Sequence, residues 1–335
     1  MAELPRIAVT MGDPAGVGPE ICLRLLAEGP IARECVPVVF GDAAVLKRAA
    51  AATGLPCSAP VIAQAEWQAK YAAIGQPTIL DLAAIRTEDF RPGEVNAATG
   101  RAAFAFVERA IDAALAGQIV AVSTGPLSKE ALFAAGIRFP GHTEIFASRT
   151  SAHRACMMQY SEEITCTFVT THVGYHEVPG LLTTRRILDV IELTAEALVR
   201  LRGRQPKIVV CGLNPHAGEH GLFGEREEER FIIPAIEAAR EQGMMIEGPL
   251  PPDTAFLPWK RKETDAFVCI YHDQGHIPVK ALAFESAVNT TLGLPIVRTS
   301  VDHGTACDIA WQGKANPSSL FAAVRLAVRL AAKAL

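Results

Sequence analysis

The sequence predicts an α/β fold made of two α/β/α domains. Short apolar segments alternate with longer helical patterns along almost the whole chain, and this alternation is typical of sheets covered by helices on both faces. The length of 335 residues suits about two domains. Most apolar segments are continuous rather than alternating, as expected of strands buried on both faces of a largely parallel sheet.

The predicted strands are short, apolar and rich in β-branched residues. They are Ile7–Met11, Val36–Phe40, Thr78–Leu82, Ile119–Ser123, Ile164–Thr171, Lys207–Leu213, Ala266–Tyr271 and Pro295–Thr299. Four longer segments carry apolar residues at helical spacing, which predicts helices. They are Asn96–Leu115, Thr184–Leu201 with a Thr cap, Glu225–Glu241 with acids in its first turn, and Ser318–Leu335.

Composition argues against several classes of protein. The 32 Lys and Arg against 36 Asp and Glu give a net charge of −4, which disfavours a binder of nucleic-acid phosphates. No apolar run reaches the roughly eighteen residues that a membrane span needs, and the N-terminus does not resemble a signal peptide. The 8 Cys form no Cys-x-x-Cys pair and several lie in strand-like runs, as in reduced cores. We expect a soluble cytoplasmic protein with no nucleic-acid or membrane partner.

Six of the 9 histidines form three His-x-x-x-His pairs, which are His172/His176, His216/His220 and His272/His276. On a helix this spacing would place both rings on one face and indicate a zinc site. Gly and Pro within or beside each pair predict loops rather than helix interiors. We therefore reject the helical zinc motif.

The first histidine of each pair instead ends an apolar strand. These are His172, His216 and His272. Ligands of open α/β sheets bind outside the carboxyl ends of strands, so three such rings could converge on one divalent metal with open positions. Neutral imidazoles leave the ion a strong Lewis acid. The alternative is that each ring is a hydrogen-bonded loop histidine.

Two loops could bind anions or a nucleotide. Met11–Glu20 is rich in glycine, follows the first strand and opens a helix, whose N-terminus attracts anions. Its spacing is not that of the G-x-G-x-x-G fingerprint, and a tight strand–helix turn is the alternative. The segment from Asp302 to Pro317 could wrap an adenosine, or be a polar turn before the final helix.

Several polar side chains suit a substrate with carboxylate and phosphate groups. Gly141–Glu144 offers an imidazole and a hydroxyl at a predicted helix N-terminus. Lys280, Asn289 and Arg298 follow the His272 segment, and a Lys, an amide and a forked Arg bind such anions. Surface solvation is the alternative for each cation.

Seven motifs together closely resemble the 4-hydroxythreonine-4-phosphate dehydrogenases of vitamin B6 (pyridoxine) synthesis, in order and over essentially the whole chain. They are Met11–Glu20, Gly141–Glu144, Asn214–Glu219, Gly248–Phe256, Tyr271–Gly275, Asn289–Pro295 and Arg298–Ala306. The resemblance implies a homodimer that needs NAD and one divalent metal per active site. It implies oxidation of the 3-hydroxyl of a 4-phosphorylated hydroxy acid, whose 3-keto product then loses carbon dioxide.

The resemblance also implies residue roles. The metal ligands, shared between subunits, would be His172, His216 and His272. The substrate would contact His142, Thr143, Lys280, Asn289 and Arg298. The cofactor would contact Gly12, Asp13, His303, Gly304, Thr305, Ala306, Asp308 and Asn316.

Two further residues are candidates for proton transfer. Asp253, or a metal-positioned water, would remove the hydroxyl proton during hydride transfer, although Pro-Pro-Asp-Thr is also an ordinary Asp cap for the next helix. Lys280 would protonate the enol carbon or only hold an anion.

This family is itself similar to the isopropylmalate and isocitrate dehydrogenases, in the loops Gly12–Glu20 and His303–Pro317. That similarity implies a cleft between two domains. Residues 1–130 plus 296–335 would bind NAD, and residues 131–295 would bind metal and substrate and form the dimer. Asp308-Ile309 stands where bacterial NADP enzymes have Lys-Tyr, and a carboxylate repels the 2′-phosphate, so we expect NAD. Imidazole ligands suit Zn, Co or Ni better than Mg.

The substrate is less narrowly predicted. Gly221–Gly224, His276–Lys280 and Val301 resemble a branch that acts on D-threonate or D-erythronate 4-phosphate. The Gln-Gly-His-Ile-Pro stretch also occurs in terephthalate cis-dihydrodiol dehydrogenases, but Gly141–Thr143 and Asn289 favour a phosphorylated substrate. Two other classes remain open, a three-His metal hydrolase and a non-catalytic phosphate or sugar-acid binding protein.

Overall fold

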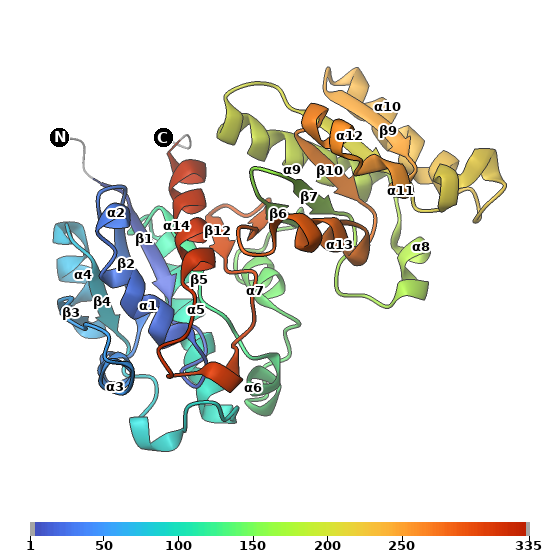
Figure 1. Cartoon of the computed structure of the whole chain (residues 1–335). Coiled ribbons are helices and arrows are strands. Elements are labelled where there is room, and N and C mark those ends of the chain that lie inside the picture. The colour runs from blue at the N-terminus through green and yellow to red at the C-terminus, as the bar shows by residue number, and fades with distance from the viewer. Residues whose placement is uncertain (1–3, 333–335) are drawn as a thin grey trace. The chain divides into compact units, whose positions relative to one another are not determined.

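The computed structural model describes residues 4–332, which divide into two compact units. Unit 1 comprises Met1–Ala152 and Leu294–Leu335, and unit 2 comprises His153–Gly293. Both described ends of the chain therefore lie in unit 1, which contains the first strand, β1, and the last helix, α14 (Figure 1). Because the chain passes through unit 2 and goes back to unit 1, no Pro/Gly/Ser-rich linker is needed between two halves of the sequence.

Unit 1 contains a parallel sheet with strand order β3-β4-β2-β1-β5-β12. Its strands are β1 (Arg6–Thr10), β2 (Val36–Gly41), β3 (Val61–Ala63), β4 (Thr78–Asp81), β5 (Ala121–Thr124) and β12 (Val297–Ser300). Every residue of β2 and β5 is buried, which explains their continuous apolar sequences.

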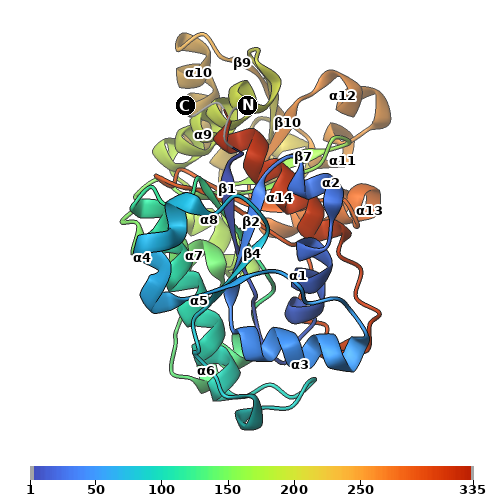
Figure 2. The ribbon, with the colours of Figure 1, turned by 90° about the vertical axis from the view of Figure 1, so that its left-hand side faces the viewer.

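Helices cover both faces of this sheet, with α1 and α14 on one side and α5 on the other (Figure 2). The α-helices of the unit are α1 (Gly18–Leu26), α2 (Gly29–Ala32), α3 (Ala43–Thr53), α4 (Trp67–Lys70), α5 (Ala97–Leu115), α6 (Lys129–Ala134), α7 (His142–Arg149) and α14 (Ser318–Ala331). Short 3-10 turns occur at Gln64–Glu66, Tyr71–Ala73, Thr87–Asp89 and Cys307–Ile309. Burial follows strand alternation, since Ile7 and Val9 pack on the α1 side and Ala8 on the α5 side.

Unit 2 contains a mixed sheet with strand order β11-β6-β7-β10-β8-β9. Its strands are β6 (Cys156–Tyr160), β7 (Thr165–Phe168), β8 (Lys207–Cys211), β9 (Met245–Leu250), β10 (Ala266–Cys269) and β11 (Val288–Leu292). Strand β6 runs antiparallel to β11 and β7, whereas β7, β10, β8 and β9 are parallel. Four parallel strands therefore direct their carboxyl ends to one edge.

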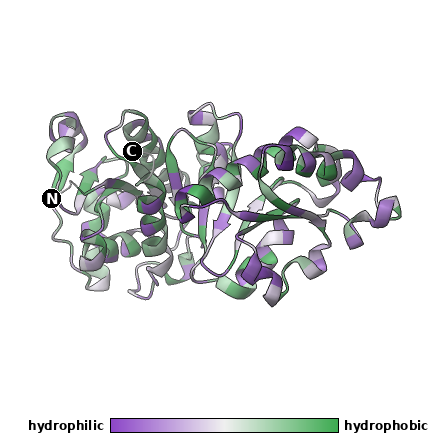
Figure 3. Ribbon diagram, turned by 90° about the horizontal axis from the view of Figure 1, so that it is seen from above, coloured by the Kyte–Doolittle hydropathy of each residue, from purple (hydrophilic) through white to green (hydrophobic). Residues whose placement is uncertain are grey.

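The α-helices of unit 2 are α8 (Val178–Leu181), α9 (Thr184–Arg202), α10 (Ile233–Glu241), α11 (Pro252–Ala255), α12 (Pro258–Glu263) and α13 (His272–Ala283). Two 3-10 turns, Tyr175–Glu177 and Pro215–Gly221, and a π-helical turn, Glu228–Ile232, complete the unit. In Figure 3 hydrophobic residues gather along the inner strands and the inward sides of helices, and hydrophilic ones along the outer loops.

All eight predicted strands are present, but β3, β6, β9 and β11 escaped prediction. Strand β3 has only three residues, and β9 contains Gly and Pro. Strands β6 (CMMQY) and β11 (VNTTL) contain few large β-branched apolar residues, yet they are mostly buried between neighbours. Tertiary burial therefore overrides a weak intrinsic preference at these positions.

The predicted helices are confirmed, with shifted ends. Thr183, one residue earlier than predicted, caps α9 by accepting a hydrogen bond from the Arg186 amide. The predicted Glu225–Glu241 helix starts later, with the π-helical turn at Glu228 leading into α10. The last helix ends at Ala331, and residues 333–335 of its predicted span lie outside the described residues.

The prediction that all three histidine pairs lie in loops is wrong for His272 and His276. Both are in α13, which continues through Pro278 in its interior. Gly275 allows the helix to approach the sheet, because a Cβ there would lie 2.7 Å from Phe168 and 2.8 Å from the Cys269 sulfur. Tight packing of the helix therefore offsets its low propensity.

Three other expectations bear on the whole chain. All eight cysteines carry free thiols, and six of them are buried, as predicted. Among residues 4–332, no helix is long and apolar enough to cross a membrane. The predicted domain boundary after residue 130 falls inside α6 and leaves α7 in the second domain, whereas the compact unit 1 includes both helices, which pack on α5. Which part binds NAD and which binds metal and substrate stays a prediction.

Candidate active site

The three predicted metal ligands leave the same edge of the unit 2 sheet. His172, His216 and His272 follow the carboxyl ends of β7, β8 and β10. These strands are neighbours in the order β7-β10-β8 and are parallel. The sheet therefore delivers all three segments to one side, as ligand sites of α/β folds require.

Two of these rings lie together. The ring centroids of His172 and His272 are 5.9 Å apart, and both line a cavity of about 440 Å³ with Tyr175 and Tyr271. Beyond the strand ends, the Thr170 hydroxyl donates a hydrogen bond of 2.8 Å to the Ile270 carbonyl. This bond holds the two histidine segments side by side.

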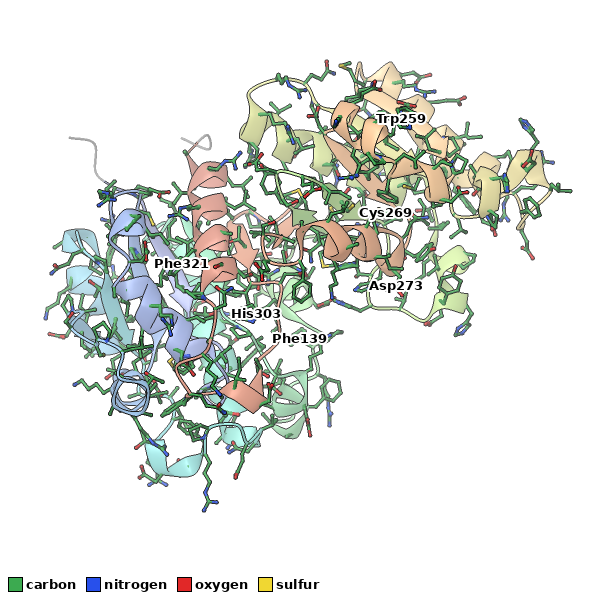
Figure 4. All side chains as sticks on the ribbon, viewed as in Figure 1. Phe139, Trp259, Cys269, Asp273, His303 and Phe321 are labelled. Atoms are coloured by element: carbon green, nitrogen blue, oxygen red, sulfur yellow. The ribbon has the colours of Figure 1, made fainter. Side chains whose placement is uncertain are left out.

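A neighbouring carboxylate fixes the tautomer of His272. Its Nδ1 lies 2.7 Å from Oδ1 of Asp273. Asp273, labelled in Figure 4, is the second residue of α13. A carboxylate accepts, so Nδ1 carries the hydrogen, and the neutral form of the ring that a metal binds has its lone pair on Nε2. Imidazole ligands of metals commonly donate their other N–H to a carboxylate, so His272 has the chemistry of a ligand.

His216 lies in a loop of left-handed backbone. His216, Ala217, Glu219 and His220 all have positive φ, from 45° to 58°. Glu228 anchors the start of this loop. It is 1% exposed and accepts hydrogen bonds from the Leu213 and Asn214 amides. Left-handed non-glycine residues are unfavourable, and such strain clusters at functional sites.

The predicted three-histidine centre is not assembled within the described part of one chain. The His216 ring stacks on Phe223, with 6.0 Å between centroids, and its Nδ1 is 3.5 Å from Glu219. No three His, Cys, Asp or Glu side chains of residues 4–332 form a group able to hold a metal ion. Completion of the centre by a second subunit stays a prediction.

Gln274 links the His272 segment to the His216 segment. Its Oε1 accepts a hydrogen bond of 2.7 Å from the Ile270 amide, and its Nε2 donates one of 2.8 Å to the Gly212 carbonyl. The side chain is buried. Together with Asp273 and Glu228, it forms a support for the histidines that sequence reasoning did not assign. For Gln274 and Asp273, the sequence signal that could have found them was their place inside the Tyr271–Gly275 motif.

The two candidates for proton transfer, Asp253 and Lys280, are exposed side chains of unit 2. Asp253 is the second residue of α11 and lines a cavity of about 390 Å³ together with Tyr271 and Asp273. Pro251 is the N-cap of α11 and Asp253 lies inside its first turn, so the alternative that Asp253 caps this helix is wrong. Lys280 lies on α13, two turns beyond His272.

Asn289, the remaining substrate candidate of unit 2, is half-buried on β11, where its Nδ2 lies 3.1 Å from the Met157 sulfur. The other substrate candidates belong to unit 1. His142 and Thr143 begin α7, confirming the predicted helix N-terminus.

Arg298 is a buried cation, so the alternative that it is an ordinary solvated surface residue is wrong. Its side chain is 2% exposed on β12, and Nη2 donates to the Thr124 hydroxyl at 3.0 Å. Burial lowers the pKa of Arg298 to about 9, an effect that nearby Glu144 opposes. Burial, with the charge of Arg298, also lowers the pKa of His142 well below its ordinary value, so this imidazole is neutral.

The two predicted cofactor loops pack against each other in unit 1. The Val17 amide donates to the Thr305 carbonyl at 2.9 Å, and the Trp311 indole donates to the Pro14 carbonyl at 3.2 Å. A Cβ on Gly16 would lie 2.7 Å from the Thr305 oxygen, which explains the glycine. The structure therefore brings together the two segments that the sequence singled out for NAD.

Not every residue of these loops faces outward. Gly12 has φ +75°, and a Cβ there would lie 2.4 Å from the Pro126 oxygen. Asp13 is 1% exposed and accepts from the Ala15 amide at 2.9 Å and the Thr99 hydroxyl at 3.3 Å. Burial raises the pKa of Asp13, and these bonds oppose the rise. Both residues shape the loop from inside.

The second loop is more open. His303, labelled in Figure 4, has Nδ1 2.8 Å from the Gly304 carbonyl, so Nδ1 carries the hydrogen. Asp308 is exposed, Thr305 and Ala306 are half-buried, and Gly304 has open space around it. The Asn316 side chain accepts from the Ser318 amide at 3.0 Å and so begins α14, which gives it a structural role.

Comparisons with known proteins agree with these features. The model of the family described as "Pyridoxal phosphate biosynthetic protein PdxA" matches residues 33–327. The chain belongs to the PdxA family. This membership confirms the predicted resemblance, and because its relatives carry the names of dehydrogenases, the chain is an oxidoreductase.

Individual relatives match over their whole length. A 4-hydroxythreonine-4-phosphate dehydrogenase of Desulfosudis oleivorans is 47% identical, covering 99% of this chain and 98% of that one. A putative D-threonate 4-phosphate dehydrogenase of Oceanobacillus iheyensis is 45% identical, covering 99% of each. The crystal structure of 4-hydroxythreonine-4-phosphate dehydrogenase from Klebsiella pneumoniae is 42% identical, with TM-score 0.83 and coverage of 98% and 99%.

One more distant structure bears on the fold alone. A β-decarboxylating dehydrogenase from Thermococcus kodakarensis has TM-score 0.50 at 16% identity, covering 96% of this chain and 82% of that one. The predicted fold class is confirmed.

Proposed function

We propose that this chain oxidises the 3-hydroxyl of a 4-phosphorylated hydroxy acid with NAD and a divalent metal, and that the keto acid then loses its carboxylate as carbon dioxide. The candidate substrates are 4-phosphohydroxy-L-threonine and D-threonate or D-erythronate 4-phosphate. The observation that carries the proposal is the match over 99% of the chain, at 45% and 47% identity, to proteins named for two such substrates.

We propose His172, His216 and His272 as metal ligands, with His216 supplied by the partner subunit of a homodimer. The donor set fits a metal, since two imidazoles lie 5.9 Å apart and Asp273 leaves Nε2 of His272 with its lone pair. A divalent ion would supply Lewis-acid polarisation of the substrate oxygens. Three imidazoles favour Zn, Co or Ni over Mg.

We propose that NAD binds where the loops Gly12–Glu20 and His303–Pro317 pack together. Glycine amides after β1 can approach a phosphate, and the exposed Asp308 carboxylate can accept from a ribose diol while repelling a 2′-phosphate. NAD is therefore the proposed cofactor, and unit 1 the part that binds it.

We propose that the substrate's anionic groups are held by the Lys280 ammonium, the Arg298 guanidinium and the Asn289 amide, together with His142 and Thr143. Neutral His142 can donate one hydrogen bond, and Thr143 begins a helix whose N-terminus favours anions. Asp253 is the proposed acceptor of the hydroxyl proton, and Lys280 the proposed donor to the product carbon. Eight free thiols also support a reducing, cytoplasmic location.

The test is an assay of NADH absorbance with each of four substrates, namely 4-phosphohydroxy-L-threonine, D-threonate 4-phosphate, D-erythronate 4-phosphate and terephthalate cis-dihydrodiol. Each is measured with and without added Zn²⁺, Co²⁺ or Ni²⁺ after chelation. We expect metal-dependent NADH formation and release of carbon dioxide with one of the phosphorylated acids. Turnover of the dihydrodiol alone would contradict the proposed substrate class, and hydrolysis without NADH would contradict the proposed reaction.

A further inference from the structure

We infer that His276 is a positioning residue, which stacks on the His272 ring and holds it in the orientation that a metal requires. The inference deepens the proposed function, because it rests on His272 as a metal ligand. His276 is not itself a proposed ligand. Its side chain is 6% exposed and lies one helical turn beyond His272 on α13.

The two imidazoles form a close parallel stack. Their ring centroids are 3.8 Å apart and the ring planes differ by 12°. His276 also stacks on Phe168 of β7, with 4.4 Å between centroids and 25° between planes, and the Phe168 and His272 centroids are 6.4 Å apart. The ring of His276 therefore packs against both Phe168 of the sheet and His272. It provides a flat support that restricts rotation of His272.

Hydrogen bonds at both nitrogens fix the orientation of the supporting ring. Nδ1 of His276 lies 2.9 Å from the His272 carbonyl oxygen, which can only accept, so Nδ1 carries the hydrogen. Nε2 lies 3.4 Å from the amide nitrogen of Gln159, which can only donate, so Nε2 accepts. Both contacts require the same neutral tautomer. No nitrogen of His276 remains to bind a metal.

His272 is thereby held from two sides. Asp273 accepts a hydrogen bond of 2.7 Å from its Nδ1, and His276 restrains the plane of the ring by stacking. A ligand with both constraints loses little rotamer freedom when metal binds. Loss of outer contacts of this kind weakens metal binding by about 10- to 100-fold in metalloproteins.

The experiment measures metal affinity in four full-length variants. They are His276→Leu, His276→Phe, Gln159→Met and, as a matched control, His153→Leu at an exposed histidine of the same unit. Zn²⁺ affinity of the metal-free protein is measured by calorimetry, the Co²⁺ absorption spectrum reports ligand geometry, and thermal unfolding separates a loss of folding from a loss of site geometry. His276→Phe keeps a ring to stack on and removes the Nδ1 hydrogen bond.

We expect His276→Leu to weaken Zn²⁺ binding by about 10- to 100-fold and to change the Co²⁺ spectrum. His276→Phe and Gln159→Met should have smaller effects of the same sign, and His153→Leu none. If His276→Leu does not fold, the other two variants decide the question. Wild-type affinity and an unchanged spectrum in the variants that fold would overturn the inference alone. A wild-type protein that binds neither ion would overturn the proposed metal centre itself.

Discussion

Replacing Glu228 by Ala should loosen the loop that carries His216. The Glu228 carboxylate accepts three hydrogen bonds, from the Leu213 amide at 2.9 Å and from the amide and side chain of Asn214 at 2.8 and 2.9 Å. Each hydrogen bond to a charged group contributes about 1.5–3 kcal/mol, but water entering the vacated space can replace part of this. We expect a net loss of about 3 kcal/mol in the free energy of opening the loop.

Native-state hydrogen exchange measures this local effect. A loss of about 3 kcal/mol corresponds to an increase of roughly 150-fold in the exchange rates of the Leu213 and Asn214 amides. Glu225→Ala, at an exposed position three residues earlier, is the matched control and should leave both rates unchanged. Exchange of both amides within twofold of wild type in Glu228→Ala would refute the assigned support of the loop.

Three further outcomes are expected. Changing Asp308–Ile309 to Lys-Tyr should raise kcat/KM for NADP relative to NAD by about tenfold or more, since a cation replaces a carboxylate beside the 2′-position, and an unchanged ratio would show that the adenosine loop is misplaced. Gly16→Ala should weaken NAD binding by about tenfold in a fluorescence titration, because its Cβ would lie 2.7 Å from the Thr305 oxygen, whereas Gly29→Ala, with nothing within 4 Å, should not. Burial raises the pKa of Asp13, so its ionisation opposes folding above that pKa and has no effect below the ordinary value of 3.8. Asp13→Asn should therefore raise Tm at pH 7, and the difference should shrink as the pH falls, whereas a lower Tm at pH 7 would contradict the sign.

The fold class and the position of the site at one edge of the sheet could be predicted from the sequence, because both depend on local patterns. Continuous apolar runs such as Ile208–Cys211 predict buried parallel strands, and a polar residue after such a run predicts the edge where ligands bind. That reasoning placed His172, His216 and His272 after β7, β8 and β10, which the structure shows as adjacent parallel strands.

The features that could not be predicted from the sequence depend on tertiary packing. The helix from His272 to Ala283 contains Gly and Pro, and its close packing against Phe168 and Cys269 offsets their low helix propensity. Likewise, a carboxylate such as Glu228 resembles any helical surface acid until its burial beneath a loop is seen. The left-handed backbone at His216 could not be read from the sequence either, because only Gly218 of this stretch adopts it without strain, and Ala217 and Glu219 do not favour it.

The most direct measurement of the central claim is anomalous diffraction from crystals of the full chain grown with Zn²⁺, recorded on both sides of the zinc absorption edge. The account predicts one strong peak per active site, within bonding distance of Nε2 of His272 and of a nitrogen of His172 and of His216, the last from a second subunit. A peak away from these rings, or none in protein shown by calorimetry to bind the ion, would contradict it.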